Sequence, residues 1–442
     1  MSEKTILVWF RNDLRVHDNE ILFEAIRKAD KVLPVYCFDP FYFKTTDLGL
    51  SKTGNIRARF LLESVADLRQ NLQKLGGELI IRTGNPAEII PQLAQQYQVC
   101  EVYHHREVAY EETEISEEVE AALWKIKLNL KHFIGHTLYH KEDLPFPIKD
   151  IPDSFAVFKK KVERDSDVRP CIETPENIIV PPIVDAGVLP ALADLGLTDP
   201  VEDQRAAFYY KGGETTGLHQ LQQYILNLDK MIISKGVKHG VDHSSRLSAW
   251  ISLGCLSMRW VYRELTKNSQ GSHNSNSLLM LELLWRDYFR FMFKKHGKQF
   301  FNTEGSEEES PVLDINENEL FEKWKTGHTG MPFVDASMHE LNATGYMGNY
   351  NRQIVAGFLV NELKVEWTRG AAYFEEKLID YSPASNLGNW AFLAGVDNDP
   401  RDSRYFSGAK QTAAAYNSSD FISTWLPGVY DADNSLAHAT TV

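Results

Sequence analysis

Two serine hydroxyls and an arginine lie directly before a helical run near the middle of the chain. Residues 243–248 read HSSRLS, and the apolar run 249–253 follows at once. The first turn of a helix offers free backbone N–H groups and the positive end of the helix dipole, and serine and arginine side chains donate hydrogen bonds to phosphate oxygens. The segment predicts either a phosphate-binding site or an ordinary helix N-cap, and both interpretations stay open at this point.

A second candidate is the amphipathic helix expected over residues 281–298, LELLWRDYFRFMFKKHGK. Charged side chains recur in it every four residues and so share one face. They are Glu282, Arg286, Arg290, Lys294 and Lys298, and the adjacent stripe is formed by Trp285, Phe289 and Phe293. This pattern is typical of a solvated basic face, and equally of a basic, aromatic-flanked groove that binds DNA or another polyanion.

Two later segments, residues 329–360 and 378–406, place polar side chains where the apolar spacing predicts buried helices. These side chains are Asn349, Arg352, Asp380, Asn386, Asn389 and Trp390. A carboxylate and an arginine inside a helical core need each other or a ligand, because lone buried charges are costly. The pattern predicts a structural ion pair or a pair that binds a ligand.

A metal site is not expected. His132, His136 and His140 are spaced by four, but Gly135 and the strand-like sequence around them argue against the helix that would bring them together. No Ser-His-Asp, P-loop or CxxC constellation stands out. The four cysteines lie far apart in the sequence and are expected to be reduced, buried thiols.

The first part of the chain alternates strand and helix signals. Strands are expected at residues 5–10, 31–38, 78–82, 101–105 and 130–134, with helices at 20–28 and 56–75. Such alternation predicts an α/β fold with a doubly wound, mostly parallel sheet. The turn after the first strand reads FRNDLR instead of GxGxxG, so a dinucleotide-binding function of this sheet is not supported.

The remaining chain divides into a connector and a helical half. Nine prolines between residues 145 and 200 argue against a long helix there. After residue 202 amphipathic helical windows follow one another to about residue 406. We therefore expect an α/β domain at 1–140, a connector at 141–201 that crosses a surface, and an all-α domain at 202–442.

Composition limits the class of protein. The 442 residues are 43% hydrophobic and 24% charged, as in a folded protein with more than one core. No stretch approaches the roughly 20 apolar residues that span a bilayer, and the N-terminus carries no signal segment, so a cytoplasmic protein is expected. The formal charge of −14 argues against broad, non-specific binding of nucleic acid, although a local basic groove stays compatible with it.

Taken together, these segments resemble the photolyase/cryptochrome family, most of all its cryptochrome DASH branch. The match rests on VWFRNDLRVHDN (8–19), HREV (105–108), EDLPF (142–146), GGETTGL (212–218), SSRLSAWISLGCLS (244–257), LELLWRDYFRF (281–291), TGMPFVDASMHELNATGYM (329–347), LIDYSPASNLGNW (378–390) and AGVDNDPRDSRYF (394–406). It spans nearly the whole chain in the family's order. The family fold is an α/β antenna domain, a long connector and a helical FAD domain.

The resemblance implies FAD in the helical domain. The cofactor-binding residues that it implies are Ser244, Ser245, Arg246, Leu247 and Ser248 at the pyrophosphate, and Glu282, Asn349, Arg352, Asp380, Ser382 and Asn386 around the flavin. Arg352 and Asp380 would form an ion pair beside the ring, and Asn386 would face its N5. Trp390 and Trp367 match the family's inner electron-transfer tryptophans. A 5,10-methenyltetrahydrofolate antenna is common in the α/β domain of such proteins.

The same resemblance implies light-driven repair of DNA. Glu282 and Trp285 match the carboxyl group and the aromatic wall that meet a cyclobutane pyrimidine dimer flipped out of the strand. The DNA-side positions are Arg286, Asp287, Phe289, Asn349, Tyr350 and Gln411. DASH members favour lesions in single-stranded DNA, which avoids extraction from a duplex. A monomer is expected.

Several positions depart from the family pattern. Ser382 stands where the family often has aspartate, and Phe392 stands where a tyrosine or tryptophan is usual. No tryptophan occurs near Asp314, the place of the outermost electron-transfer residue, so Trp324 would be a different exit. Residues 232–240 lack the usual tyrosine and arginine, and four glutamates in residues 303–311 oppose phosphate binding.

Three functions follow as hypotheses. The first is a DASH-type photolyase that repairs pyrimidine dimers in single-stranded DNA. The second is a blue-light photoreceptor without repair activity, which passes its redox change to a signalling partner; the acidic segment and the altered pocket favour it. The third is a helical binding module that has lost FAD.

Overall fold

A computed structural model describes residues 3–233, 244–267, 273–297, 315–395 and 419–427. Its first part is a five-stranded parallel sheet in the order β3-β2-β1-β4-β5. The strands are β1 (Thr5–Phe10), β2 (Lys31–Phe38), β3 (Ile80–Thr83), β4 (Val99–His105) and β5 (Leu130–Phe133), and the helices between them are α1 (Glu20–Lys28), α2 (Asn55–Lys74), α3 (Pro86–Gln96) and α4 (Tyr110–Lys125). The predicted doubly wound α/β domain is confirmed.

The central strand β1 shows why this sheet is buried on both sides. All six of its residues are buried. Ile6, Val8 and Phe10 pack into one core, whereas Leu7 and Trp9 pack into a second core with α3 and α4. Alternate side chains of a strand point to opposite faces, and a parallel sheet covered by helices on both faces therefore reads as a continuous apolar run.

The connector is not free of helix. After the short turns η2 (Lys141–Asp143) and η3 (Ile148–Asp150) comes α5 (Phe155–Asp165). The Phe155 ring stacks on Trp285 with centroids 3.5 Å apart, so α5 belongs to the packing of the helical part. The following chain, which includes the turn η4 (Leu192–Leu195), runs along the α/β domain, where Ile178 N–H donates to Leu75 O and Ile81 N–H donates to Ala186 O.

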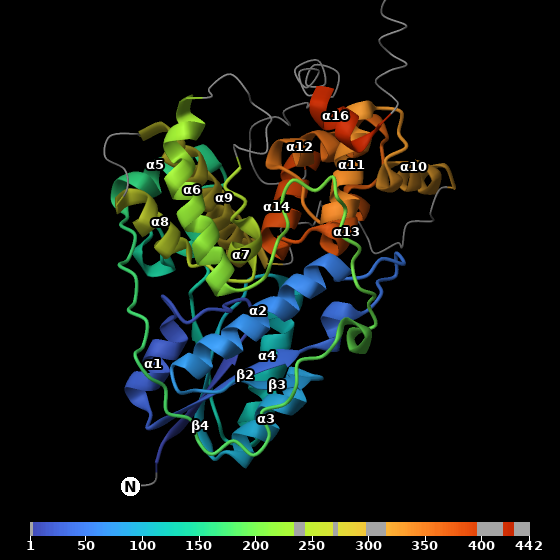
Figure 1. Ribbon diagram of the computed structural model, residues 1–442. Coiled ribbons are helices and arrows are strands. Elements are labelled where there is room, and N and C mark those ends of the chain that lie inside the picture. Colours follow the sequence, from blue (N-terminus) through green and yellow to red (C-terminus); the bar gives the residue numbers. More distant parts are fainter. Residues whose placement is uncertain (1–2, 234–243, 268–272, 298–314, 396–418, 428–442) are drawn as a thin grey trace, which may run out of the picture.

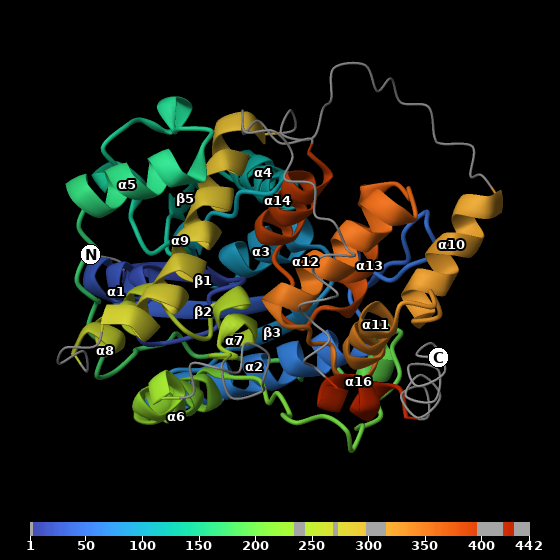
Figure 2. The same ribbon diagram turned by 90° about the horizontal axis from the view of Figure 1, so that it is seen from above.

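The helical part lies above the sheet domain in two groups of helices (Figure 1). One group holds α6 (Glu214–Ile233), α7 (Ser248–Ser252), α8 (Met258–Lys267) and α9 (His273–His296). The other holds α10 (Ile315–Thr326), α11 (Pro332–Thr344), α12 (Asn349–Gly357) with the π-helical turn η7 (Phe358–Glu362), α13 (Trp367–Lys377), α14 (Pro383–Ala394) and α16 (Ser419–Trp425). Seen from above, α14 lies between α9 and α13 (Figure 2).

Polar side chains of the loop after β1 join the two domains. The buried Arg15 guanidinium donates to Gly254 O at 2.9 Å, and Asp18 pairs with Arg259 at 2.7 Å. The Glu214 carboxylate accepts the backbone N–H of His17 and contacts the His17 ring. Buried charges are tolerated here because each has its partner across the interface. The FRNDLRVHDN segment therefore holds the helical domain against the sheet domain.

Candidate functional site

The expected ion pair of Arg352 and Asp380 is present at the start of α12. The Arg352 Nη2 atom lies 2.9 and 2.8 Å from the two Asp380 carboxylate oxygens, and Arg352 Nε donates to Met347 O at 2.7 Å. Asp380 comes from the turn before α14, 28 residues away. The guanidinium is therefore held rigidly by a carboxylate and a carbonyl, and its Nη1 group has no hydrogen-bond partner among the described residues.

A cavity of about 70 Å³ opens beside this ion pair. Its walls include Arg352, Asp380, Ser382, Asn386 and Trp390. The Asn386 amide nitrogen donates to Ala371 O at 3.0 Å, so its amide oxygen is the group left to accept a hydrogen bond from a ligand. The sequence-predicted residues on the ring side of the flavin are thus brought together in one place. Asn349, at the first position of α12, also lines this cavity and is exposed.

The segment expected at the pyrophosphate folds into a tight turn before α7. Ser244 Oγ accepts the Arg246 N–H at 3.2 Å, and Ser245 Oγ accepts the Leu247 N–H at 3.4 Å. Arg246 has φ of 54°, a left-handed conformation that a non-glycine residue adopts only where its surroundings demand it. The Leu247 side chain is buried, so only its backbone could meet a phosphate. Ser248 begins α7 itself.

Two polar atoms near this turn are buried without a hydrogen-bond partner among the described residues: Arg246 Nε and the Tyr210 hydroxyl. The Tyr210 and Tyr346 rings lie 5.5 Å apart, and the Arg246 guanidinium lies over the Tyr346 ring. Buried polar groups are normally paired, so these atoms point to an acceptor supplied by a ligand. Serine, arginine and tyrosine donors converging here fit the phosphates of FAD, and the Arg352–Asp380 pair fits its ring.

Sequence reasoning missed Tyr346 and Glu340. Tyr346 shares a hydrogen bond of 2.8 Å with Ser244 Oγ, which ties the segment after α11 to the turn before α7. Burial raises the pKa of the Glu340 carboxyl to about 7, against the opposing effects of Arg246 and Arg352. The order Tyr-Met-Gly-Asn before Arg352 was a usable signal for Tyr346, since it continues the motif that supplies the arginine.

Helix α9 places its predicted residues in very different surroundings. Glu282 is exposed, yet desolvation by the surrounding protein raises the pKa of its carboxyl to about 7, and Arg352 is close enough to oppose the shift. Arg286 is half-buried and donates to Ile251 O at 3.3 Å. Trp285 is half-buried, and Phe155 covers one face of its ring.

Two of the predicted DNA-side residues on α9 are buried in the interior instead. The Asp287 carboxylate is fully buried and accepts the backbone N–H groups of Leu138 and Tyr139, each at 2.9 Å. Phe289 packs against Gly388 of α14, where a Cβ atom would come within 2.3 Å of the ring. The prediction of DNA contacts is therefore wrong for both, because tertiary packing, and not helical spacing, decides which side of α9 meets solvent.

Of the other DNA-side residues, Tyr350 is half-buried on α12, and Gln411 lies outside the described residues. Trp390 is buried in the core and Trp367 is half-buried at the start of α13. Trp324 is fully buried, its ring centroid 6.3 Å from that of Trp390, and its Nε1 donates to Val355 O. The other departures noted in the sequence, at 234–240, 303–311 and Asp314, also fall outside the described residues.

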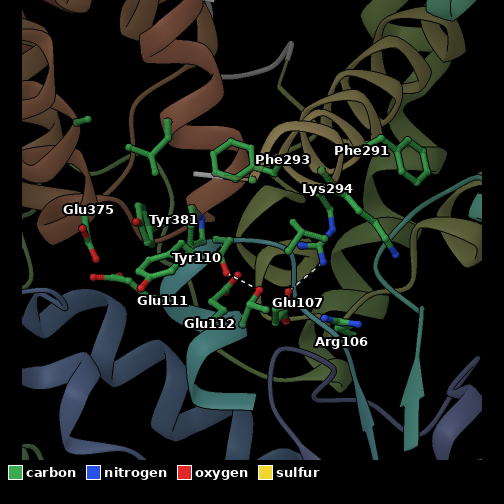
Figure 3. Close-up of a pocket in the computed structure, with 18 of the residues that line it drawn as sticks. Arg106, Glu107, Tyr110, Glu111, Glu112, Phe291, Phe293, Lys294, Glu375 and Tyr381 are labelled. Carbon is green, nitrogen blue, oxygen red and sulfur yellow. Dashed lines mark hydrogen bonds and ion pairs between the residues drawn. The ribbon is translucent and has the colours of Figure 1, made fainter. Parts of the chain in front are cut away.

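The largest cavity among the described pockets lies between the two domains and has a volume of about 780 Å³ (Figure 3). Sequence reasoning did not find it. Its floor holds Glu107, which pairs with Arg290 at 2.9 Å and with His136 at 3.3 Å. Burial would raise the pKa of Glu107, but the His136 ring and the Arg290 guanidinium hold it below its usual range. Burial, and then the Glu107 charge, raises the pKa of the Glu112 carboxyl to about 8.

This cavity changes the interpretation of the charged face of α9. Arg290 is buried in its ion pair with Glu107, so it belongs neither to a solvated face nor to a DNA groove. Lys294, one turn later, lines the same cavity. Lys298 lies outside the described residues. The basic end of α9 faces the interdomain cavity.

The surroundings of the histidines and cysteines bear on the question of a metal site. His132 lies on strand β5, as the sequence predicted, and no group of three or more His, Cys, Asp or Glu side chains in the described part of the chain is arranged to hold a metal. Cys37 and Cys255 are buried, Cys171 is half-buried and Cys100 is exposed on β4, so the expectation of buried thiols is wrong for Cys100 and holds only in part for Cys171. In the described ranges no helix has the length and apolar character needed to cross a membrane.

Comparison with known proteins gives two family matches. Residues 6–177 match the model of DNA photolyase, and residues 279–441 match that of the FAD binding domain of DNA photolyase. Cryptochrome DASH of Gloeobacter violaceus is 46% identical, with 97% of this chain and 86% of that protein covered. Cryptochrome DASH of Natronomonas pharaonis is 42% identical, with 98% and 92% covered.

The fold of the chain is also similar to that of solved cryptochrome and photolyase structures. The Synechocystis sp. PCC6803 cryptochrome superposes with a TM-score of 0.90 at 40% identity, covering 97% of this chain and 90% of that one. The archaeal photolyase from Sulfolobus tokodaii, solved with two FAD molecules, superposes with a TM-score of 0.78 at 25% identity, covering 99% and 94%.

Proposed function

The chain belongs to the photolyase/cryptochrome family, and on that premise we propose that it is a blue-light-dependent FAD flavoprotein of the cryptochrome DASH type. Its proposed reaction is the repair of cyclobutane pyrimidine dimers in single-stranded DNA. Bound flavin would supply the light-driven electron for this repair, as the resemblance implies. The chain's own residues would bind the flavin, bind the lesion and hold the lesion close to the flavin.

The observation that carries the proposal is the exposed position of Glu282 together with the raised pKa of its carboxyl. Its carboxyl is solvent-accessible, stands near the Arg352–Asp380 pair, and has its pKa raised to about 7 by desolvation. Near neutral pH a large fraction is therefore protonated and can donate a hydrogen bond to a carbonyl of a flipped pyrimidine dimer. An ordinary ionised glutamate could only accept. A raised pKa at an accessible carboxyl is typical of a functional group.

The flavin would be held from two sides. Arg352, kept in place by Asp380, would contact the ring, and the Asn386 oxygen would accept a hydrogen bond at its edge. Arg246 and Ser244 would donate to the pyrophosphate. Ser382 offers a hydroxyl where a carboxylate is usual, so this edge of the ring would meet less negative charge.

A single-stranded substrate fits the charge of the chain. A duplex has to be held along its backbone by many cations while a base pair is opened, and the chain carries a net charge of −14. The accessible candidates for DNA contact are Arg286, Asn349 and Tyr350. We expect a small, local DNA footprint and a monomeric protein.

The interdomain cavity is the proposed place of the 5,10-methenyltetrahydrofolate antenna. Its volume of about 780 Å³ lies in the range of small-molecule sites. A second cavity, at the carboxyl ends of β1 and β2, is smaller, at about 100 Å³. Tyr381 lines both the interdomain cavity and the flavin cavity, so an antenna would lie one side chain away from the flavin site.

The second candidate function is a blue-light photoreceptor that signals without repair. Four glutamates in residues 303–311 oppose DNA binding, and the absence of a tryptophan near Asp314 removes the usual last electron-transfer residue. The third hypothesis, loss of FAD, is disfavoured by the unpaired Arg246 and Tyr210 atoms, which need a polar ligand.

The test has two stages. The visible spectrum of the purified protein, before and after incubation with FAD, comes first; a protein that never takes up flavin would exclude both light-dependent functions. Chemically reduced protein is then mixed with an oligonucleotide that carries one thymine dimer. Restoration of the thymines under blue light, and none in darkness, supports the photolyase; no restoration despite bound reduced flavin supports the photoreceptor.

A further inference from the structure

The buried hydroxyl of Tyr210 has a proton to donate and no acceptor. The Tyr210 side chain is 8% exposed, and its hydroxyl has no hydrogen-bond partner among the described residues. Its ring packs against Trp250 and Tyr346, with centroids 5.5 Å apart in both cases. Burial raises the pKa of the hydroxyl well above its usual value, so the proton stays in place. A buried donor without an acceptor destabilises a folded chain, and a ligand that accepts the hydrogen bond removes this cost.

The charges around this hydroxyl suit an anion. The Arg246 and Arg352 guanidinium groups and the Asp380 carboxylate all act on it electrostatically. Asp380 pairs with Arg352 at 2.8 Å and so balances one of the two arginines. The Glu340 carboxyl lies near both arginines, but burial raises its pKa to about 7, so much of it is uncharged at neutral pH. The group as a whole therefore carries net positive charge, which a phosphate would balance.

Tyr210 belongs to the segment 208–213, which ends the connector just before α6. Phe208 of the same segment lies against the Arg246 guanidinium, with its ring centroid 5.0 Å from the central carbon. The segments that carry the family resemblance resume only at Gly212, so they include neither of these aromatic residues. Residues 232–240 lack the tyrosine that is usual there, and Tyr210 offers a hydroxyl that those residues cannot supply.

Helix α2 of the α/β domain holds this segment directly. The Gly212 N–H donates to Glu63 Oε2 at 2.7 Å, and the Gly213 N–H donates to Ser64 Oγ at 3.0 Å. The approach is close, because a Cβ atom on Gly212 would come within 2.1 Å of Phe60 O. The backbone two residues after the tyrosine is therefore fixed to a helix of the other domain.

We infer that Glu63 positions Tyr210 to donate a hydrogen bond to a phosphate of FAD, so that retention of the cofactor depends on a contact with the α/β domain. The inference rests on the proposed flavin site. Tyr210 is the binding residue in this arrangement. Glu63 is a positioning residue, which acts through the backbone of Gly212.

Tyr210→Phe should act differently on the flavin-bound and the flavin-free chain. Loss of a hydrogen bond to a charged phosphate should weaken FAD binding about tenfold to a hundredfold. In the flavin-free chain the same change removes an unpaired buried hydroxyl, so the midpoint of thermal unfolding should be at least as high as before. Tyr209→Phe is the matched control. It removes a hydroxyl that donates to Asp203 O at 2.8 Å on the exposed side of the segment, and it should leave FAD affinity within about twofold.

The experiment measures FAD affinity of the flavin-free full chain by equilibrium dialysis, and the release of FAD from the loaded chain after dilution. Glu63→Ala removes the acceptor of the Gly212 N–H and should weaken FAD binding about tenfold, whereas Glu63→Gln keeps an acceptor oxygen and should retain most of the affinity. In the Tyr210→Phe background, Glu63→Ala should change the affinity less than about twofold, because the hydroxyl that it positions is already gone.

The outcomes separate this inference from the proposed function. If the unmodified chain never takes up FAD, both fail. If it binds FAD and Tyr210→Phe binds it equally tightly, or if flavin-free Tyr210→Phe unfolds at a lower temperature, only the inference is overturned. Equal losses from Glu63→Ala in both backgrounds would overturn the positioning role. Riboflavin has no phosphate, so a loss of riboflavin affinity in Tyr210→Phe as large as that of FAD would also overturn the inference.

Discussion

Repair should depend on the protonation of Glu282 in a way that its surroundings predict. Desolvation raises the pKa of this carboxyl to about 7, so the protonated, donating form is the one present at lower pH. About nine tenths of the carboxyl is protonated at about pH 6 and about one tenth at about pH 8. If only the protonated form donates to the lesion, the repair rate at subsaturating substrate should fall about tenfold over this interval.

The matched variant is Glu282→Gln. Its amide donates at every pH, so repair should continue with a flat profile between about pH 6 and about pH 8. Glu282→Ala has no donor and should be slow throughout, while it retains flavin. The carboxyls of Glu340 and Asp287 also have pKa values near 7 and titrate in the same interval. If the repair rate of Glu282→Gln still fell between about pH 6 and about pH 8, the dependence would come from such groups.

The assay is single-turnover repair of a thymine dimer in a single-stranded oligonucleotide, with chemically reduced flavin under saturating blue light. Chemical reduction removes any pH dependence of photoreduction from the measurement. The reasoning is refuted if the unmodified chain repairs equally well at both ends of the interval, or if Glu282→Gln keeps the full tenfold slope. Equal losses of repair and of flavin in Glu282→Ala would contradict the role assigned to this side chain.

Three further substitutions test the packing around the sites. Asp287→Ala leaves two buried backbone N–H groups unpaired and should lower the free energy of unfolding by about 2–6 kcal/mol, while the folded protein keeps its affinity for single-stranded DNA; weaker DNA binding without loss of stability would restore the DNA role. Arg290→Met leaves the buried Glu107 carboxylate without its cation and should lower the free energy of unfolding in urea by about 3–5 kcal/mol. Adding Glu107→Gln should restore most of this loss. A double variant no more stable than Arg290→Met alone would contradict the pairing. Asp380→Asn leaves the Arg352 charge without its partner, and we expect purified protein with about one tenth of the flavin absorbance or less, whereas full retention would place the flavin elsewhere.

The regular elements could be predicted because their signals are local. Strands β1 and β2 begin and end at the residues that the apolar runs indicated, and α1 begins after Asn19, whose side chain accepts the Leu22 N–H. Strand β4 begins two residues before the expected position, where Val99 already pairs with β1. Apolar runs bounded by turn and cap residues contain this information in a few neighbouring positions.

The partners of the buried charges could not be predicted in the same way. Arg290 and Glu107 are 183 residues apart in sequence, and the contact exists only after α9 has packed on the loop after β4. The pair of Arg352 and Asp380 was expected because the family resemblance supplies both positions. No comparable pattern in the sequence predicted that the Asp287 carboxylate would accept hydrogen bonds from the backbone of Leu138 and Tyr139. An aspartate on an exposed helix face has the same local sequence around it.

The spacing of charges on α9 explains why one predicted face became part of two sites. An α-helix turns by about 100° per residue, so a stripe of side chains four residues apart advances by about 40° at each step. Between Glu282 and Lys294 the stripe has turned by about 120° and risen by about 18 Å. Glu282 accordingly stands near Arg352 at the flavin cavity, whereas Arg290 and Lys294 face the interdomain cavity. A single basic groove for DNA would need the charges to stay on one side of the helix over this length. Their slow rotation instead lets one helix contribute an acid to the proposed repair site and a cation to the rim of the proposed antenna site.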